Sequence, residues 1–420
     1  MRLQQVMSRA LALVQSHWWL APLVLLVSGA SRLVLSFVTR TGLNMVDLRV
    51  YSFGAQSLER GELYTFTFSE MTPNFPLPFT YPPFAALLFF PLHYVPITAL
   101  AVLWLVVTMV ALWGVVRLSL TLLLGAERSA EPFWRNAAML WAAVGIWMEP
   151  VRTTLDYGQV NVFLVLGGLA AATTSRWWLA GGIVGVLAGV KLTPAITGLY
   201  FLAQRRYLAA VFSAVAFAAT IAISFLAIPD ATRTYFGELL GKADRIGPVG
   251  SAINQSLRGV LSRFAGHDVG TGPVWVVAVL LAAALCVCAW RGLAADDRLG
   301  TLVIVQLFGL LVSPISWSHH WVWLVPAVLW LAHGPLRQTR LAFVASLVWV
   351  VVMLIGVIAL LLLQQPSIWE FERPLLESIS GAIYPAGTAF ILVLMGLQRR
   401  LVRPRPAVPQ PAVPAPRPVA

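Results

Sequence analysis

Charged side chains are scarce in this sequence. They make up 11% of its 420 residues, whereas an average soluble domain is about one quarter charged, so the chain lacks the polar groups to cover a surface facing water. Its hydrophobic residues, 59% of the total, gather in blocks such as 207–228 and 341–363 that are long enough to cross a bilayer. This composition excludes a soluble enzyme, a DNA-binding module and a disordered chain. It predicts an all-α polytopic membrane protein.

Cysteine is also rare, and several common catalytic motifs are absent. The two cysteines, Cys286 and Cys288, lie two positions apart in one apolar block, where their side chains diverge on a helix. We interpret them as small buried hydrophobes rather than as a disulfide or a metal pair. The sequence contains no phosphate-binding loop, no zinc-spaced Cys/His set, no G-x-S-x-G elbow and no Asp-x-Asp pair. Chemistry with ATP, NAD or a nucleotide sugar is therefore disfavoured.

Arginine supplies almost all of the net charge of +12, since Lys191 and Lys242 are the only lysines. The arginines gather in short connections between the apolar blocks and in the tail, and short arginine-rich loops lie on the cytoplasmic side of membrane proteins. We therefore predict that both termini are cytoplasmic. Hydropathy predicts about twelve membrane-spanning segments, at 18–38, 84–116, 136–150, 159–174, 178–190, 193–204, 207–227, 272–290, 299–313, 321–333, 341–363 and 383–398.

The predicted organisation is a single transmembrane domain over residues 1–400, followed by a Pro/Arg-rich cytoplasmic tail over 401–420. With this orientation two long segments, 39–82 and 228–271, lie on the external side. Connections of this length in a compact protein usually have a function. The external side is therefore where we expect the functional residues.

The first external segment contains a helical pattern. Leu48, Tyr51, Ala55 and Leu58 share one face at a spacing of three and four residues. This spacing predicts an amphipathic helix that lies flat on the outer surface of the bilayer. The proline-rich run that follows, 73–83, excludes a helix until the next apolar block begins.

Two pairs of apolar blocks are too short to cross the membrane, because a spanning helix needs about 20 residues. The first pair is interrupted by Lys191-Leu192-Thr193-Pro194, and the second by residues 314–320, which end in His319 and His320. Irregular backbone at membrane depth persists only where it is buried in protein or lines a wet cavity. The two breaks therefore predict a polar cavity open to the external side.

Asp47 and Lys191 are the main candidates for chemistry in this cavity. Asp47 follows the first span, and it is either a catalytic carboxylate or an N-cap of the amphipathic helix, for which aspartate is a favoured residue. Lys191 lies in an apolar stretch, where a charge usually has a partner or a function. Its amine either extends to the membrane interface or binds an anionic lipid headgroup, most naturally a phosphate.

The histidine pair at the second break has two interpretations. His319 and His320 point to different sides of a helix, so they are poor ligands for one metal. One of them could form hydrogen bonds to a phosphate, or both could pack at the interface beside Trp317, Trp321 and Trp323.

Two polar stretches carry groups suited to sugars and phosphates. Asn254-Gln255-Ser256-Leu257-Arg258 lies in the second external segment, and the arginine fork matches phosphate oxygens. Gln159 and Asn161 lie at the outer start of another block and present amides that could bind sugar hydroxyls. A solvated loop is the alternative for both stretches.

Several short stretches together resemble one family. They are Val46-Asp47-Leu48-Arg49-Val50-Tyr51 with Gly61-Glu62-Leu63-Tyr64, Tyr81-Pro82-Pro83-Phe84, Gly158-Gln159-Val160-Asn161, Lys191-Leu192-Thr193-Pro194 and Ser316-Trp317-Ser318-His319-His320. Their order is similar to that of the actinobacterial polyprenol-phosphate-mannose-dependent mannosyltransferases of the GT-C class. The resemblance covers residues from about 18 to 400.

The resemblance implies a GT-C-like bundle, with a catalytic role for the 1–400 domain. It implies an inverting transfer of mannose from polyprenyl-phosphate mannose to a mannolipid acceptor, a phosphatidylinositol mannoside, with an α-1,2 linkage. No cofactor, no metal and no nucleic acid is implied.

The resemblance also implies roles for individual residues. Asp47 would be the general base, and Lys191, Arg258 and one of His319 or His320 would stabilise the leaving phosphate. The residues implied to bind substrate are Tyr51, Glu62, Gln159, Asn161, Asn254 and Gln255.

Three other functions stay open. A transporter or lipid flippase would need a polar path through the membrane, and Arg32 is the only other clear intramembrane charge. A noncatalytic lipid-binding scaffold is a second alternative. An arabinosyl- or lipomannan-branching transferase of the same superfamily is the third, because no residue reports the identity of the acceptor.

Overall fold

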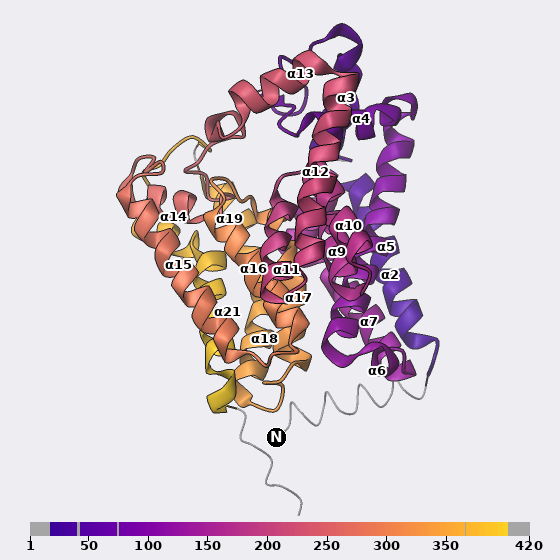
Figure 1. The fold of residues 1–420 in the computed structure, drawn as a ribbon, viewed down its shortest axis with the longest axis vertical. Helices are drawn as coiled ribbons and strands as arrows, with labels where there is room; N and C mark the ends of the chain where they lie inside the picture. The colour runs from indigo at the N-terminus through magenta and orange to yellow at the C-terminus, as the bar shows by residue number, and fades with distance from the viewer. Residues whose placement is uncertain (1–16, 40–42, 74, 366, 402–420) are drawn as a thin grey trace, which may run out of the picture.

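The computed structural model describes residues 17–39, 43–73, 75–365 and 367–401 (Figure 1). The predicted tail, apart from Leu401, lies outside these residues. Helices dominate the described chain, so the predicted helical class is confirmed. The described chain has one small antiparallel sheet, in which β1 (Thr67–Phe68) pairs with β2 (Leu77–Pro78).

The elements of the first half follow the predicted blocks closely. They are α2 (Leu20–Val38), α3 (Val46–Gln56), the 3₁₀ turn η1 (Ser57–Arg60), α4 (Pro83–Phe89), η2 (Phe90–Tyr94), α5 (Ile97–Leu124), α6 (Ala126–Ser129), α7 (Pro132–Gly145), α8 (Glu149–Tyr157), α9 (Asn161–Thr173), α10 (Trp177–Val190), η3 (Thr193–Ile196), α11 (Thr197–Ala203) and α12 (Tyr207–Ala227).

The second half begins with a short helix that continues into a π-helix. Its elements are α13 (Pro229–Thr234), the π-helix η4 (Tyr235–Leu239), η5 (Ala243–Arg245), α14 (Leu257–Ala265), α15 (Pro273–Gly292), α16 (Arg298–Val312), η6 (Ser318–Trp323), α17 (Leu324–His333), α18 (Arg340–Ile355), α19 (Val357–Gln364), α20 (Leu375–Ser380) and α21 (Ile383–Leu401).

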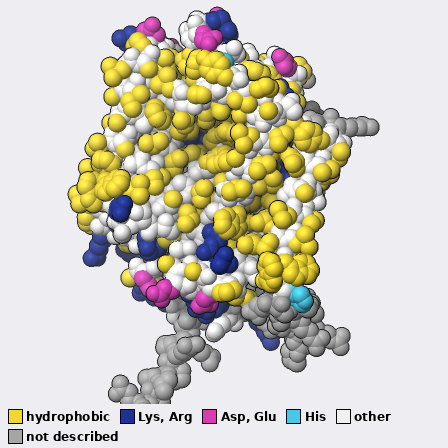
Figure 2. All heavy atoms as spheres, turned by 90° about the vertical axis from the view of Figure 1, so that its right-hand side faces the viewer, with side chains coloured by type: hydrophobic (Ala, Val, Ile, Leu, Met, Phe, Trp, Pro, Cys, Tyr) yellow, Lys and Arg dark blue, Asp and Glu magenta, His cyan; other side chains and the backbone are white. Residues whose placement is uncertain are grey.

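Five stretches of the described chain are long and apolar enough to cross a membrane: α2, α5, α12, α15 and the α18–α19 stretch. Figure 2 shows a broad apolar band on one face, with charged side chains gathered toward its two ends. This distribution suits a molecule whose middle faces lipid. The larger number of about twelve spans stays a prediction, because the other apolar helices are shorter.

Several predicted blocks are divided in the structure, and two of them are divided at proline or glycine. Block 84–116 becomes α4, η2 and α5, because Pro91 and Pro96 interrupt the helix and α5 begins directly after Pro96. Block 341–363 becomes α18 and α19, which are separated by Gly356 at φ +76°. Left-handed backbone of this kind ends a helix and is tolerated by glycine.

The predicted amphipathic helix is present as α3. Leu48, Tyr51 and Ala55 on its apolar face are each 0% exposed, and the helix packs against α4 and η2. Its apolar face is therefore covered by protein. A position on the bilayer surface stays a prediction.

Helices α10 and α12 pack with their backbones in close contact. Gly181, Gly185 and Gly189 repeat every fourth residue on α10, and a Cβ at Gly185 would lie 2.5 Å from the carbonyl oxygen of Ser213 on α12. Small residues at this spacing let helices in a membrane approach closely. The packing fixes the end of α10, from which Lys191 follows directly.

Figure 1 shows how the bundle is arranged. Helix α2 begins and α21 ends at the same end of the bundle, and α3 and α13 lie at the opposite end. In this view α16 and α17 lie near the middle of the bundle. The break after α16 contains the buried residues Ile315 and Ser316, whereas the break after α10 is half-buried at Lys191 and exposed at Thr193.

Candidate active site

Asp47 is placed by the way α3 begins. Met45 precedes the helix with left-handed backbone (φ 46°, ψ 33°), and its N–H donates to the carbonyl oxygen of Asp156 at 2.9 Å. The position before the helix is occupied by Met45, and the side chain of Asn44 accepts from the N–H of Val46 at 3.1 Å. The interpretation of Asp47 as the N-cap is therefore wrong. Its carboxylate is free for another role in the first helical turn.

The carboxylate of Asp47 is partly buried and accepts a hydrogen bond from the side chain of Gln159. Burial raises the pKa of Asp47 to about 6, although the Gln159 bond and the positive charge of Lys191 both act to lower it. Removal from water disfavours the ionised form, which explains the direction of the shift. A carboxylate with this pKa can take up a proton near neutral pH.

Gln159 is oriented by two tyrosines. Its Oε1 accepts from the hydroxyl of Tyr51 at 2.9 Å and from the hydroxyl of Tyr81 at 3.1 Å, and the two hydroxyls lie 2.8 Å apart. All three side chains are buried. Because both hydroxyls hold the carbonyl oxygen of the amide, its NH₂ group is directed to Asp47.

Lys191 lies at the end of α10 and faces the same group. Its Nζ donates to Oδ1 of Asn161 at 3.0 Å and to Nε2 of His320 at 3.1 Å, and it lies 5.3 Å from the centre of the Tyr81 ring. Asp47 and Lys191 are also close enough to influence each other electrostatically. Asp47, the predicted base, therefore contacts Gln159, and Lys191, the predicted phosphate-binding cation, contacts Asn161. Gln159 and Asn161 are two positions apart in the chain.

The structure distinguishes the two histidines. His320 contacts Lys191, whereas His319 packs edge-on against Tyr157 at 5.6 Å and gives its backbone oxygen to Nδ2 of Asn161 at 2.9 Å. Both ring nitrogens of His319 and Nδ1 of His320 are buried without a hydrogen-bond partner in the described chain. His320 is thus the histidine that faces the lysine, and its Nδ1 is available to a ligand.

The alternative of tryptophan packing at the membrane interface is not supported. Trp321 is 0% exposed and Trp323 is 7% exposed, and Trp321 packs against the ring of Tyr384 at 5.6 Å. These rings lie inside the protein. The second break is therefore buried, as the short blocks predicted.

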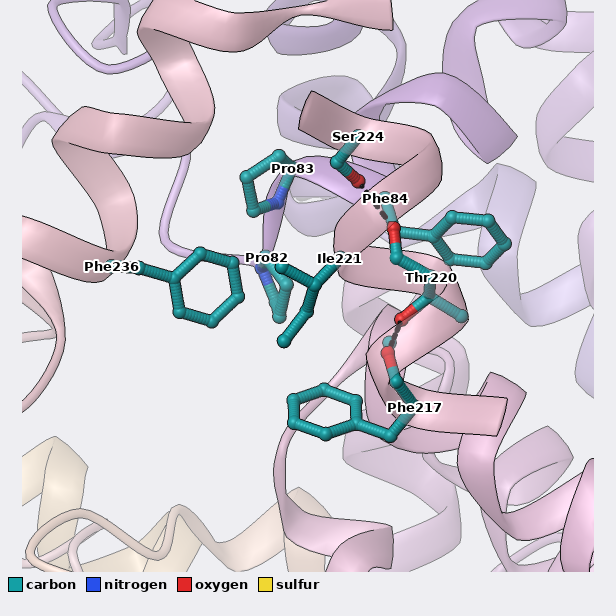
Figure 3. A pocket seen from close by; sticks show the side chains of 9 residues that line it. Pro82, Pro83, Phe84, Phe217, Thr220, Ile221, Ser224 and Phe236 are labelled. Atoms are coloured by element: carbon teal, nitrogen blue, oxygen red, sulfur yellow. Dashed lines mark hydrogen bonds between the residues drawn. The ribbon is translucent and has the colours of Figure 1, made fainter. Parts of the chain in front are cut away.

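A cavity of about 280 Å³ adjoins this group. Asn161 and His320 belong to its lining, which is otherwise mostly apolar and comes from α9, η3, α11, α16 and η6. A smaller recess lies between the start of α4, α12 and the π-helix η4, as Figure 3 shows. In that view Phe236 faces Pro82 and Ile221 across the recess.

Four predicted site residues do not join this group in the structure. Arg258 forms a two-point ion pair with Asp268, at 2.9 and 2.6 Å. Glu62 is exposed and bonds to Arg60 at 2.8 Å. The other two are Asn254 and Gln255.

Asn254 and Gln255 are buried, and their amides bind protein backbone. The NH₂ group of Asn254 donates to the carbonyl oxygen of Val249 at 3.0 Å, and that of Gln255 donates to the carbonyl oxygen of Gly381 at 2.7 Å. Since the loop uses these amides internally, they are not presented to a sugar. In the structure these amides hold the segment 228–271 against the rest of the protein.

Because Arg258 pairs with Asp268, we expect its replacement to have little effect. Arg258→Gln should leave the rate of the predicted sugar transfer within about twofold of the wild type, because Arg258 pairs with Asp268 and the group around Asp47 loses no contact. The measurement is the initial rate of product formation, with Asp268→Asn as the matched control. If Arg258→Gln loses about tenfold or more of the rate and Asp268→Asn does not, Arg258 takes part in the reaction after all.

Sequence reasoning gave no role to Tyr81 or Thr154. Tyr81 lies near the end of the proline-rich run; its ring lies 5.3 Å from Nζ of Lys191 and its hydroxyl donates to Gln159. Thr154 donates to the backbone oxygen of His319 at 3.2 Å. The Tyr-Pro-Pro stretch was the available signal for Tyr81, whereas a threonine inside a helix gave none.

The helix α8 connects the site to the C-terminal helices. Glu149 at its start is 0% exposed, and its carboxylate accepts from the hydroxyl of Tyr384 in α21 at 2.7 Å and from the N–H of Ala359 in α19 at 2.6 Å. A buried carboxylate is tolerated only when its oxygens are bonded in this way. Both ends of α8 are thus fixed, since Thr154 near its end contacts the second break.

No set of three or more His, Cys, Asp or Glu side chains in the described ranges could hold a metal ion. Within the site the fixed cation is Lys191.

Comparison with known proteins identifies the family. Residues 79–314 match glycosyltransferase family 87. A Mycobacterium tuberculosis protein described as a polyprenol-phosphate-mannose-dependent alpha-(1-2)-phosphatidylinositol pentamannoside mannosyltransferase is 49% identical over 92% of this chain and 89% of its own length. A Mycolicibacterium smegmatis protein with the same description is 49% identical over 91% of this chain and 92% of its own length.

A second Mycobacterium tuberculosis protein, described as a phosphatidylinositol mannoside mannosyltransferase with the same donor and linkage, is 33% identical over 84% of both chains. No solved structure gives a significant match. The family predicted from the short stretches is thereby confirmed, and the chain belongs to glycosyltransferase family 87.

Proposed function

We propose that this enzyme transfers mannose from polyprenyl-phosphate mannose to a phosphatidylinositol mannoside and forms an α-1,2 linkage with inversion. The names of the similar mycobacterial proteins support the donor, the acceptor and the linkage. The structural observation that carries the proposal is the placement of Asp47 and Lys191 beside Gln159 and Asn161, next to a cavity whose lining includes Asn161.

In the proposed reaction Asp47 is the general base. The acceptor hydroxyl oxygen attacks the anomeric carbon of the donor mannose while its proton passes to the Asp47 carboxylate. The bond from the anomeric carbon to the phosphate oxygen breaks, and its electron pair leaves with polyprenyl phosphate. Attack and departure on opposite faces invert the anomeric centre.

The leaving phosphate needs charge stabilisation rather than a proton. Lys191 supplies a positive charge, and its bonds to Asn161 and His320 hold the amine in place before the substrate arrives. Fixed charges of this kind stabilise a transition state without reorganisation. His320 also offers its Nδ1, which has no hydrogen-bond partner among the described groups.

The membrane arrangement is part of the proposal. We infer one domain over residues 1–400, about twelve apolar segments, an active site on the external side and both termini in the cytoplasm. The arginine-rich short loops support this orientation, and so does the common end at which α2 begins and α21 ends (Figure 1). Helix α3 would then lie near the outer membrane surface, at the opposite end.

Lipid transport is less well supported than transfer. Arg32, the other charge within a span, forms an ion pair with Asp156. This ion pair joins α2 to α8, so the charge of Arg32 has a partner within the protein.

The direct test is an assay of the purified protein with polyprenyl-phosphate mannose and a panel of mannolipids. We expect a product one mannose longer, whose new linkage is cleaved by an α-1,2-mannosidase. Product with an arabinosyl donor and none with a mannosyl donor would contradict the proposal. Activity in excess EDTA should equal that without it, because Lys191 supplies the charge at the phosphate.

The pKa of Asp47 predicts a pH dependence. The base must be ionised, and burial raises its pKa to about 6. The value of kcat/KM should therefore be level above about pH 7 and fall about tenfold per pH unit below pH 6. The measurement is the rate between pH 5 and pH 8 at low donor concentration. A level profile down to pH 5 would exclude a base with this pKa.

A further inference from the structure

We propose that the cavity beside Lys191 holds the first isoprene units of the donor lipid, an assignment that rests on the proposed function above. The cavity and the proposed phosphate site share two residues. Asn161 and His320 lie 3.0 and 3.1 Å from Lys191 Nζ, and both belong to the cavity lining. A phosphate bound by Lys191 therefore has the cavity directly beside it.

The lining of the cavity suits a branched hydrocarbon. Leu192, just before η3, supplies apolar surface together with Ile196 of η3, Leu310 of α16 and Trp323 of η6. Burial of apolar groups against such surface is favourable in proportion to the area covered. The wall therefore offers an isoprenoid chain apolar surface directly beside the proposed phosphate site.

The buried polar pair in the wall does not oppose this assignment. Gln306 Nε2 donates to Thr197 Oγ1 at 2.8 Å, so the two side chains bond to each other. A polar group that has a partner can be covered by an apolar ligand without an unmade hydrogen bond. Ser313 in the same wall also has a partner, because its hydroxyl donates to the carbonyl oxygen of Ile315 at 2.9 Å.

The volume limits how much of the chain is held. The cavity measures about 280 Å³, near the lower end of the range of about 300–1,000 Å³ that is usual for small-molecule pockets. It can enclose the units next to the phosphate but not a long polyprenyl chain. We therefore expect donor affinity to rise over the first few isoprene units and then to level off.

The recess in Figure 3 is the alternative place for the chain. Its lining includes Phe217 and Ile221 of α12 and Phe236 of η4, but neither Lys191 nor His320. It is also smaller than the cavity. A substitution in the recess therefore serves as a control. It also fills an apolar pocket, but it does not touch the proposed phosphate site.

The test uses the full-length protein and two synthetic mannosyl phosphates, one with a single isoprene unit and one with seven. Val312 lines the cavity from α16, so Val312→Phe reduces its volume. We expect the wild type to have a much lower KM for the seven-unit donor than for the one-unit donor. Val312→Phe should raise the KM for the seven-unit donor about tenfold, which removes most of that difference.

Two further variants complete the test. Thr193→Phe fills the mouth from an exposed position and serves if Val312→Phe folds poorly, and Ile221→Phe fills the recess as the control. Ile221→Phe should retain the chain-length dependence of the wild type.

Three results would overturn the assignment. If Ile221→Phe removes the chain-length dependence and Val312→Phe keeps it, the chain lies in the recess. If Val312→Phe raises only the KM for the mannolipid acceptor, the cavity holds the acceptor. If no variant alters either KM, the cavity binds neither lipid. Failure of the wild type with both donors would instead contradict the proposed function itself.

Discussion

Asp47→Asn should lower kcat by about 10²–10⁴-fold, the range that a positioned general base contributes. The amide has nearly the shape of the carboxylate and can still bond to Gln159, so the fold and the KM for the donor should change little. The loss appears in kcat because the amide cannot take the proton from the acceptor hydroxyl. The measurement is the rate of mannose transfer at saturating concentrations of both lipids.

The control for this variant is Glu62→Gln, which removes another carboxylate from the same segment, residues 39–82. Glu62 is exposed and bonds to Arg60 outside the group around Asp47. Its variant should keep the wild-type rate, which also tests its predicted role in substrate binding. Equal rates for Asp47→Asn and the wild type would remove Asp47 from the mechanism.

Lys191→Gln should lower kcat by about 10²–10³-fold, the effect of losing one preorganised group that stabilises developing charge. Glutamine can still reach Asn161, but it brings no positive charge to the leaving phosphate. Because that charge grows as the bond to the anomeric carbon breaks, kcat should fall more than donor affinity. Steady-state kinetics with varied donor concentration separate the two effects.

Lys191→Arg is the matched variant, because it keeps the charge and changes only the shape of the donor group. We expect it to recover part of the activity that Lys191→Gln loses. A rise in the KM for the donor at unchanged kcat would mean that Lys191 only binds the phosphate in the ground state.

Local patterns in the sequence predicted the helices and the breaks well. The predicted block 207–227 coincides with α12, and Lys191 lies at a break, as the short blocks indicated. These features depend on runs of apolar residues and on neighbouring polar ones. Such information is contained in a short window of sequence.

Contacts between distant parts of the chain were not predictable in the same way. The amides of Asn254 and Gln255 looked available for a sugar, yet Gln255 donates to Gly381, which lies 126 residues away. A polar stretch in a loop looks the same whether its partners are ligands or distant backbone. Arg258 was misjudged for a related reason, because Asp268, ten residues on, returns to pair with it.

The anchoring of α8 has a consequence for how the two lipids meet. The carboxylate of Glu149 links the start of this short helix to α19 and α21 by hydrogen bonds. Near the end of the helix, the backbone oxygen of Asp156 accepts from the N–H of Met45, which lies two residues before Asp47. Gln159 and Asn161 follow directly and reach the base and the amine. This anchored helix therefore sets the distance between the proposed proton acceptor and the proposed phosphate site before either lipid binds. We expect turnover to depend on lateral entry of the lipids rather than on closure of the protein around them.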